Sequence, residues 1–110
     1  IIKNIKTLIN KYDYIFVSVI SPLLKTRKFS RKTFGDNYNE IYVYCSLATL
    51  IKRDTKGLYK KAQKNLIKNL IGFNSIIKYE KSNYKKIKIN TEKHNLINSI
   101  KILKKKLKMN

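Results

Sequence analysis

The sequence predicts an α/β domain in which helices flank a parallel β-sheet. Three short stretches, at residues 14–20, 39–45 and 86–90, are rich in β-branched and aromatic residues and are typical of strands. Stretches with apolar residues at helical spacing lie between and around them. Strands that alternate with helices form βαβ units and a parallel sheet. Because three strands are few for such a sheet, we expect a partial three-layer arrangement of helix, sheet and helix.

The first expected strand, "YIFVSVI" at 14–20, is apolar nearly throughout, which is typical of a central strand covered on both faces. Ser21 and Pro22 end it, since proline cannot donate a hydrogen bond to a sheet. The second and third expected strands are "NEIYVYC" and "KIKIN".

Helices are expected where the apolar spacing is helical, at residues 2–11, 23–34, 47–54, 58 to about 70, and 92–108. Ser46 can cap the helix that begins at 47, and Asn90 or Thr91 can cap the last one. Gly72 is expected to break the helix that begins at 58. We expect His94 to be an ordinary surface residue in the first turn of the last helix.

The length of 110 residues suits one domain or part of one, with one modest core. No stretch approaches the roughly 18 apolar residues that a membrane span needs. Cys45 is the only cysteine, so the chain can form no internal disulfide, and we expect a reducing cytoplasm as its setting.

The formal net charge of +20 invites a nucleic-acid interpretation, because lysine and arginine displace counterions from phosphates. Arginine, however, occurs only at positions 27, 31 and 53, although its fork is the group that best matches guanine and phosphate. Abundant Lys, Asn and Ile together are what AT-rich codons encode. We therefore favour lysine on solvated faces over a nucleic-acid-binding surface, which remains the alternative.

Several kinds of site have no counterpart in the sequence. No G-x-x-x-x-G-K-[ST] phosphate loop and no G-x-G-x-x-G turn occurs. One cysteine and one histidine cannot form a structural zinc site, and we predict no metal ligands. With six carboxylates and no paired Ser, His and acid, hydrolase chemistry has little support.

The stretch "RDTKGLYKKA" at 53–62 carries the functional prediction. One interpretation is only a helix stop and restart at Gly57. The other is a lid at about 53–72 that closes over phosphates, with Gly57 and Gly72 as hinges. Arg53 and Lys56 would then reach a polyphosphate and neutralise charge during phosphoryl transfer.

This stretch resembles the lid of adenylyl-sulfate kinases, whose pattern there is R-D-x-K-G-L-Y-K-K-A. Three further pieces follow the family order: "ISPLLKTR", "KNLIGFNS" and "IKINT". The resemblance spans roughly residues 5–107 and implies that residues 1–110 are the C-terminal portion of a single adenylyl-sulfate-kinase-like domain, with an incomplete P-loop kinase fold. It also implies transfer of the ATP γ-phosphate, with Mg²⁺, to the ribose 3′-hydroxyl of adenosine 5′-phosphosulfate, in sulfate assimilation. Family members often form homodimers.

The resemblance implies a role for each matching position. Lys56 would be the catalytic residue on the lid. The substrate-binding residues would be Ile20, Ser21, Pro22, Arg27 and Leu70, and the ATP-binding residues would be Arg53, Lys56 and Thr91. The family's phosphate loop and its expected Mg²⁺ ligands would precede residue 1, so we expect the 110-residue chain to be inactive alone.

Departures from the family pattern fall on the acceptor side. Leu23 and Leu24 replace a tyrosine and an arginine, and Leu70 replaces a phenylalanine that stacks on the substrate adenine. Ile71 replaces a threonine, Asn74 replaces an aspartate, and two extra residues separate Ser75 from Tyr79. Because an aromatic face contributes about 1–3 kcal/mol to holding a base, a related kinase with another nucleotide acceptor is a second hypothesis.

Overall fold

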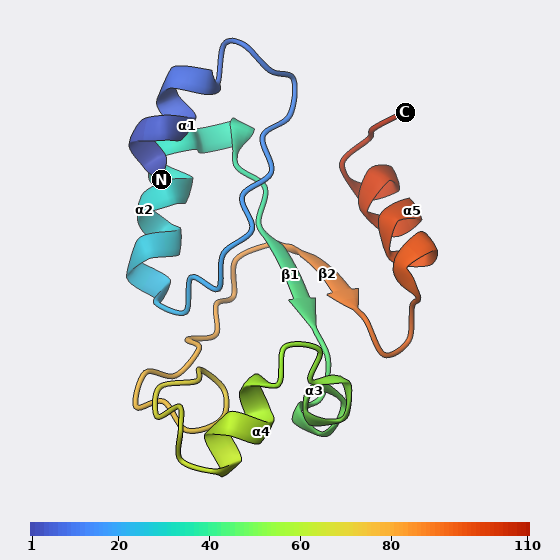
Figure 1. Ribbon diagram of the computed structural model, residues 1–110. Coiled ribbons are helices and arrows are strands. Elements are labelled where there is room, and N and C mark those ends of the chain that lie inside the picture. The colour runs from blue at the N-terminus through green and yellow to red at the C-terminus, as the bar shows by residue number, and fades with distance from the viewer.

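The computed structural model describes all 110 residues and places helices around a small parallel sheet (Figure 1). The elements follow in the order α1 (Ile2–Leu8), α2 (Leu24–Phe34), a 3₁₀ turn η1 (Gly35–Asn37), β1 (Ile41–Tyr44), α3 (Leu47–Arg53), α4 (Leu58–Gln63), β2 (Ile87–Asn90) and α5 (Leu96–Lys106). The predicted α/β class, with a partial parallel sheet and flanking helices, is confirmed.

The sheet consists of β1 and β2, which pair in parallel from Ile41 opposite Ile87 to Tyr44 opposite Asn90. Both strands fall within the predicted ranges, because the β-branched and aromatic side chains of "IYVY" and "IKIN" favour the extended backbone. Helix α5 packs back on β2, whereas α3 and α4 lie beyond the carboxyl ends of the strands (Figure 1). The residues that follow β1 and β2 therefore meet at one edge of the sheet.

The prediction of a strand at 14–20 is wrong. The segment has no strand assignment, and residues 12–20 make no hydrogen bond to any other part of the chain. Its composition suits a strand, but a strand also needs a neighbour to pair with. β1 and β2 pair only with each other, so 14–20 has none.

Two predicted helices end early. Helix α1 ends at Leu8, and α4 ends at Gln63 and not near residue 70. Asn65 has a φ of +58°, in the left-handed region that stops a helix and that asparagine tolerates better than most residues. Gly72 therefore breaks no helix; it lies in a later turn, with a φ of +85°.

The predicted cap of α3 is correct, whereas the predicted cap of α5 is not. Ser46 precedes α3 and its Oγ accepts a hydrogen bond from the Thr49 amide at 3.2 Å. Asn95 caps α5 by accepting from the Asn98 amide at 2.9 Å. Asn90 instead accepts from the Glu92 amide, which stabilises a turn, so His94 lies before the helix.

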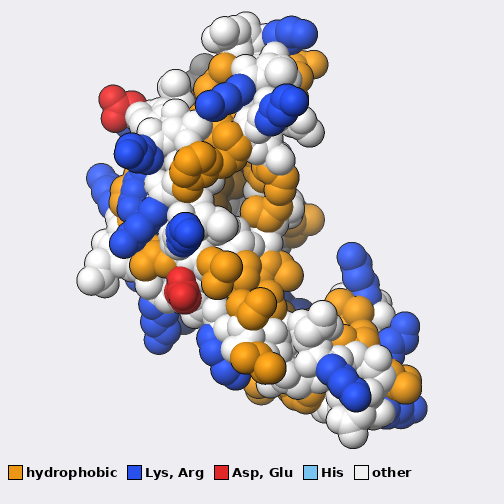
Figure 2. All heavy atoms as spheres, turned by 90° about the vertical axis from the view of Figure 1, so that its left-hand side faces the viewer, with side chains coloured by type: hydrophobic (Ala, Val, Ile, Leu, Met, Phe, Trp, Pro, Cys, Tyr) orange, Lys and Arg blue, Asp and Glu red, His pale blue; other side chains and the backbone are white.

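Few side chains are buried, and most of those that are buried are polar. Ala62 and Ile89 are the buried apolar residues, and Arg27, Glu40 and Ser75 are the buried polar ones. Many large apolar side chains lie on the surface, where Figure 2 shows them among lysines and arginines. Polar contacts therefore hold much of this structure together.

Arg27 of α2 is the centre of the largest set of these contacts. Its Nη1 donates to the carbonyl oxygens of Ser21 at 2.7 Å and Pro22 at 3.0 Å, and its Nη2 donates to the Glu80 carbonyl. Its Nε lies 3.6 Å from Glu40 Oε1, and its guanidinium lies over the Tyr79 ring, 4.5 Å from the centroid. One side chain thus joins the loop before α2, the residue before β1 and the segment before β2.

Tyr38 extends this cluster by donating its hydroxyl hydrogen to Glu40 Oε2 at 3.3 Å. Partial burial, together with the neighbouring Glu40 charge, raises the pKa of Tyr38 to about 12. The folded chain therefore holds this proton at higher pH than the unfolded chain does. It follows that Tyr38 contributes stability that is fully present below pH 10 and is lost as the pH rises toward 12.

We predict that Tyr38→Phe removes this loss of stability at alkaline pH. Between pH 9 and pH 12 the free energy of unfolding of the wild-type chain should fall by about 1 kcal/mol more than that of Tyr38→Phe, after allowance for the partial exposure of the ring. Urea titrations at four pH values measure the difference, and the contributions of the other tyrosines cancel because both chains carry them. If the free energy of unfolding of the two chains changed with pH in parallel, the role given to Tyr38 would be contradicted.

Candidate functional site

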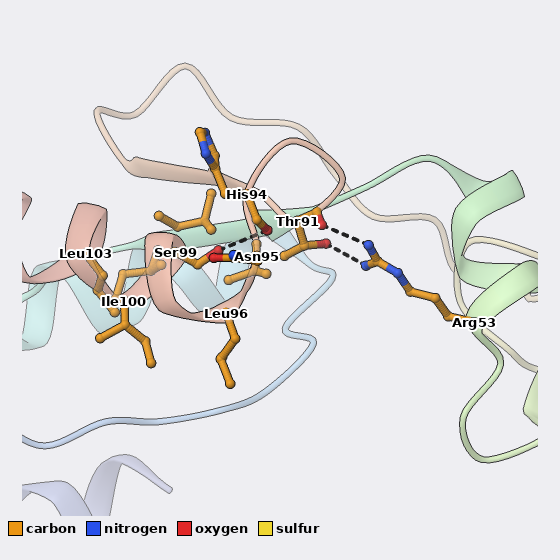
Figure 3. A pocket seen from close by; sticks show the side chains of 11 residues that line it. Arg53, Thr91, His94, Asn95, Leu96, Ser99, Ile100 and Leu103 are labelled. Atoms are coloured by element: carbon orange, nitrogen blue, oxygen red, sulfur yellow. Dashed lines mark hydrogen bonds between the residues drawn. The ribbon is translucent and has the colours of Figure 1, made fainter.

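Arg53 and Thr91 meet where the chain leaves the two strands (Figure 3). Arg53 ends α3, which follows β1, and Thr91 directly follows β2. The Arg53 guanidinium donates from Nη1 to Thr91 Oγ1 at 3.0 Å and from Nη2 to the Thr91 carbonyl at 2.8 Å. The structure thus brings together two residues predicted for the ATP side, although they are 38 positions apart.

Glu92, the next residue, binds the opposite end of α3. Its Oε1 accepts hydrogen bonds from the hydroxyls of Ser46, at 2.5 Å, and of Thr49. These hydrogen bonds lower the pKa of Glu92. Together, Thr91 and Glu92 hold both ends of α3, and we call these contacts the α3 bracket. Sequence reasoning missed Glu92, because nothing in its local sequence identifies partners 43 and 46 positions away.

The turn between α3 and α4 carries the predicted hinge. Gly57 has a φ of +66° and its amide donates to the Asp54 carbonyl at 2.8 Å. The Asp54 carboxylate accepts from the Tyr59 and Lys60 amides, each at 3.0 Å, and so satisfies the first turn of α4. Lys56 is exposed in this turn and makes no hydrogen bond or salt bridge.

The loop after α4 contains Leu70 and is stabilised by Asn74. The Asn74 side chain accepts from the Leu70 amide at 2.9 Å and donates to the Ile67 carbonyl at 2.5 Å. The Leu70 carbonyl accepts from three amides that follow it, including that of Ser75. Leu70 is half-buried, so the position that the family pattern fills with a stacking aromatic residue helps to pack the loop.

The predicted acceptor loop, Ile20 to Pro22, lies beside the Arg27 cluster. Ile20 is exposed, and Ser21 has a φ of +41°, which is uncommon for a residue other than glycine. The Glu80 amide donates to the Pro22 carbonyl at 2.9 Å, and the amide of Leu24 donates to Glu80 Oε2 at 2.5 Å. The Ser21 and Pro22 carbonyl oxygens both accept from Arg27, so this loop lies against the Arg27 side chain; its predicted contact with a substrate stays a prediction.

The donors of Arg27 contact carbonyl oxygens of this loop and of Glu80, and its side chain is buried. The structure therefore shows Arg27 positioning the loop. Its predicted contact with a substrate phosphate stays a prediction. No hydrogen bond or ion pair joins Lys56 to the acceptor loop.

A groove of about 440 Å³ lies between one face of the sheet and α5 (Figure 3). Its floor is apolar and includes Ile41, Val43 and Ile89 from the strands and Leu96 and Ile100 from α5. Arg53, Thr91, His94, Asn95 and Ser99 also line it. Sequence reasoning placed His94 on an exposed helix; the structure places it on the wall of this groove. An apolar floor with a few polar groups is typical of small-molecule sites.

No group of three or more His, Cys, Asp or Glu side chains gathers in a way that could hold a metal ion. None of the helices is both long and apolar enough to cross a membrane.

The family profile described as adenylylsulphate kinase matches residues 2–90. The chain belongs to this family. It is 39% identical over 77 residues to a probable adenylyl-sulfate kinase of Pyrococcus abyssi, which covers 70% of this chain and 42% of that protein. It is 40% identical over 74 residues to an adenylyl-sulfate kinase of Clostridium acetobutylicum, which covers 67% of this chain and 36% of that protein.

A third relative is a kinase of another nucleotide. The chain is 34% identical over 93 residues to the cytidine diphosphoramidate kinase of Campylobacter jejuni, which covers 84% of this chain and 53% of that protein. The chain therefore spans between about a third and a half of the length of these relatives. No solved structure matches it significantly.

We predict that Glu92→Gln loosens α3, because a neutral amide accepts hydrogen bonds more weakly than a carboxylate. Hydrogen exchange of the α3 amides should become roughly two- to fivefold faster at pH 7. Since the pKa of Glu92 is lowered, the stabilising effect of this carboxylate is present above its ordinary pKa of 4.5 and is lost as the pH falls below that value.

The Glu92→Gln variant should lack this dependence of α3 stability on acid pH. Asp36→Asn, an exposed carboxylate in η1, is the matched control, and equal exchange in both variants would contradict the α3 bracket.

We predict that Asn74→Asp destabilises the chain by about 1–2 kcal/mol, because an ionised aspartate cannot donate to the Ile67 carbonyl. Asn69→Asp introduces the same charge at an exposed neighbouring position and should have little effect. Urea unfolding of both variants measures the difference. Equal stability of the two variants would show that the amide hydrogen of Asn74 is not needed.

Proposed function

We propose that this chain provides the lid and the acceptor side of an adenylyl-sulfate kinase-like phosphotransferase. The observation that carries the proposal is the position of the "RDTKGLYKKA" stretch. It folds as a turn with an exposed Lys56 at the carboxyl ends of two parallel strands, the edge where α/β domains bind ligands. The family membership supports the same assignment.

In this proposal the chain contributes positioning and charge. Arg53, held against Thr91, faces the ATP side, and the apolar groove beside Thr91 would receive the adenine. Gly57, with Gly72 beyond it, would let the turn move so that Lys56 approaches the transferred phosphoryl group and neutralises its developing charge. Ile20, Ser21 and Pro22, held by Arg27, would present backbone groups to adenosine 5′-phosphosulfate, and Leu70 would contact its base.

Phosphoryl transfer also needs a phosphate cradle and Mg²⁺, which neutralises the charge on the ATP phosphates. The described residues contain neither a phosphate loop nor a carboxylate cluster. We propose that both functions come from another segment, that the 110-residue chain alone is inactive, and that the reaction takes place in the cytoplasm.

A fusion tests the proposal. The residues that precede the matched stretch in the Pyrococcus abyssi relative are joined ahead of this chain, and phosphate transfer from ATP to adenosine 5′-phosphosulfate is measured. We predict turnover by the fusion and none by the 110-residue chain. Lys56→Ala should lower kcat by at least about tenfold with little change in KM. Lys88→Ala removes the same charge from the exposed face of β2 and is the control.

Turnover by the isolated chain, or equal effects of Lys56→Ala and Lys88→Ala, would contradict these roles. A fusion that binds ATP but transfers nothing to any nucleotide would refute the kinase proposal.

A second candidate is a kinase that acts on another nucleotide, and a specific observation favours it. The departures at Leu24 and Leu70 lie on the acceptor side, and a matched relative is named for a cytidine nucleotide. Assay of the fusion with cytidine diphosphoramidate beside adenosine 5′-phosphosulfate decides between the two. A higher kcat/KM for either acceptor identifies the substrate class.

A further inference from the structure

A second hollow lies on the side of the molecule that carries α2. It has a volume of about 460 Å³, and its walls are one face of α2 and residues 81–84, which precede β2. The groove beside α5 lies across the strands from α2 (Figure 1), and the two hollows share no residue. We call this second hollow the α2 pocket. None of its lining residues belongs to the proposed lid or to the acceptor loop.

The lining of the α2 pocket is strongly basic. Lys28 and Arg31 come from successive turns of α2, and Lys81 comes from the opposite wall. No Asp or Glu side chain lines the pocket. Glu80, which adjoins Lys81, accepts a hydrogen bond from the amide of Leu24 at the start of α2. The pocket therefore gathers three positive charges with no negative charge among its lining residues.

Arg31 is held in place without the use of its hydrogen-bond donors. Its guanidinium lies over the ring of Tyr84, 3.8 Å from the ring centroid. Its side chain makes no hydrogen bond and no ion pair within the protein. Arg31 is half-buried, so stacking on Tyr84 restricts the side chain while its N–H groups stay available to a ligand. A guanidinium held in this way loses little further freedom when it binds an anion.

The wall opposite α2 is ordered by contacts of its own. The Tyr84 amide donates to Ser82 Oγ at 3.0 Å, and Lys86 Nζ donates to the Ser82 carbonyl at 2.9 Å. The Tyr84 ring packs against the ring of Tyr38, with the two centroids 6.3 Å apart. Both walls of the α2 pocket are therefore held in place before any ligand binds.

Charge and size together indicate the kind of ligand. Figure 2 shows several Lys and Arg side chains close together on the face of the molecule to which α2 belongs. The planar fork of an arginine matches the oxygens of a phosphate group. The volume of the pocket is in the range of small-molecule sites. Three cations around one such space pair better with two or more linked phosphate groups than with a single one.

We propose that the α2 pocket binds a small molecule that carries two or more adjacent phosphate groups. Arg31 donates two hydrogen bonds to one phosphate, and Lys28 and Lys81 neutralise the charge of the next. Tyr84 is a positioning residue, because it holds the Arg31 guanidinium and leaves its donors free. The proposal concerns a second anion site and does not depend on which reaction the protein catalyses.

Calorimetric titration of the 110-residue chain with sodium pyrophosphate tests the proposal. At about 150 mM salt, which screens diffuse attraction between exposed charges, we expect one saturable site per chain. Inorganic phosphate should bind at least about tenfold more weakly, because it engages fewer of the cations. Amide chemical shifts measured by NMR locate the site. Those of residues 28–31 and 81–84 should change with pyrophosphate, and those of residues 53–60 should not.

Substitutions separate a defined site from the general charge of the chain. Arg31→Gln and Lys28→Gln should each weaken pyrophosphate binding at least about tenfold, and the exposed Lys28 can be replaced without loss of packing. Tyr84→Leu keeps every charge and should weaken binding by at least about threefold, because Arg31 is no longer held. Lys32→Gln removes a charge from an exposed position of α2 outside the pocket and should change binding by less than about twofold.

Four results would overturn the proposal. The first is the lack of a saturable site. The second is equal weakening by Lys28→Gln and Lys32→Gln, which would show diffuse attraction to a basic chain. The third is a set of shifts confined to residues 53–60, which would assign pyrophosphate to the proposed lid. The fourth is tighter binding of a single-stranded oligonucleotide than of pyrophosphate, which would assign this face to nucleic acid. The kinase proposal rests on turnover by the fusion, so each proposal can fail without the other.

Discussion

The buried guanidinium of Arg27 is the contact on which most of this structure depends. A buried arginine is tolerated only when its charge is paired and its donors are satisfied. Here the charge is paired by Glu40, and Nη1 and Nη2 donate to carbonyl oxygens of the acceptor loop and of Glu80, whereas Nε lies 3.6 Å from Glu40 Oε1 without a hydrogen bond. Because the acceptor loop precedes α2, Glu40 precedes β1 and Glu80 precedes β2, three distant parts of the chain are fixed by one side chain. The few buried apolar residues could not do this alone.

The second organising feature lies at the carboxyl ends of the strands. Thr91 and Glu92 fix α3 by its two ends, and α3 in turn positions Asp54 and the turn that contains Gly57. The base of the proposed lid is therefore held rigidly, while Lys56 stays unbonded at the surface. In the proposed role, this fixed base would leave Lys56 free to approach a phosphate.

The sequence alone was sufficient for features that depend on local chemistry. The β-branched and aromatic runs at 41–44 and 87–90 form strands, and Ser46 caps α3. The stretch "RDTKGLYKKA" and three further stretches in the same order as in the family identified the family, and the match of the family profile confirms it.

Features that depend on distant partners could not be predicted in this way. Residues 14–20 make no strand hydrogen bonds because no neighbouring strand is present. Their composition alone gives no information about whether such a neighbour exists. The early end of α4 depends on the left-handed backbone at Asn65. Asn95 caps α5 in place of Asn90, because the Asn90 side chain accepts a hydrogen bond within its own turn. Glu92 was missed because its partners lie across the fold, and the groove arises only when α5 packs beside the sheet.

The α3 bracket has a consequence for how this family's chains can vary in length. Both of its residues follow β2, so the span from Lys64 to Lys86 contributes nothing to it. The two extra residues between Ser75 and Tyr79 fall inside that span, and there Ile76 is 98% exposed. Insertions at this point lengthen an exposed stretch of the chain and leave the α3 bracket in register. In the proposed kinase, the acceptor side could therefore change by insertion without altering the contacts that hold α3.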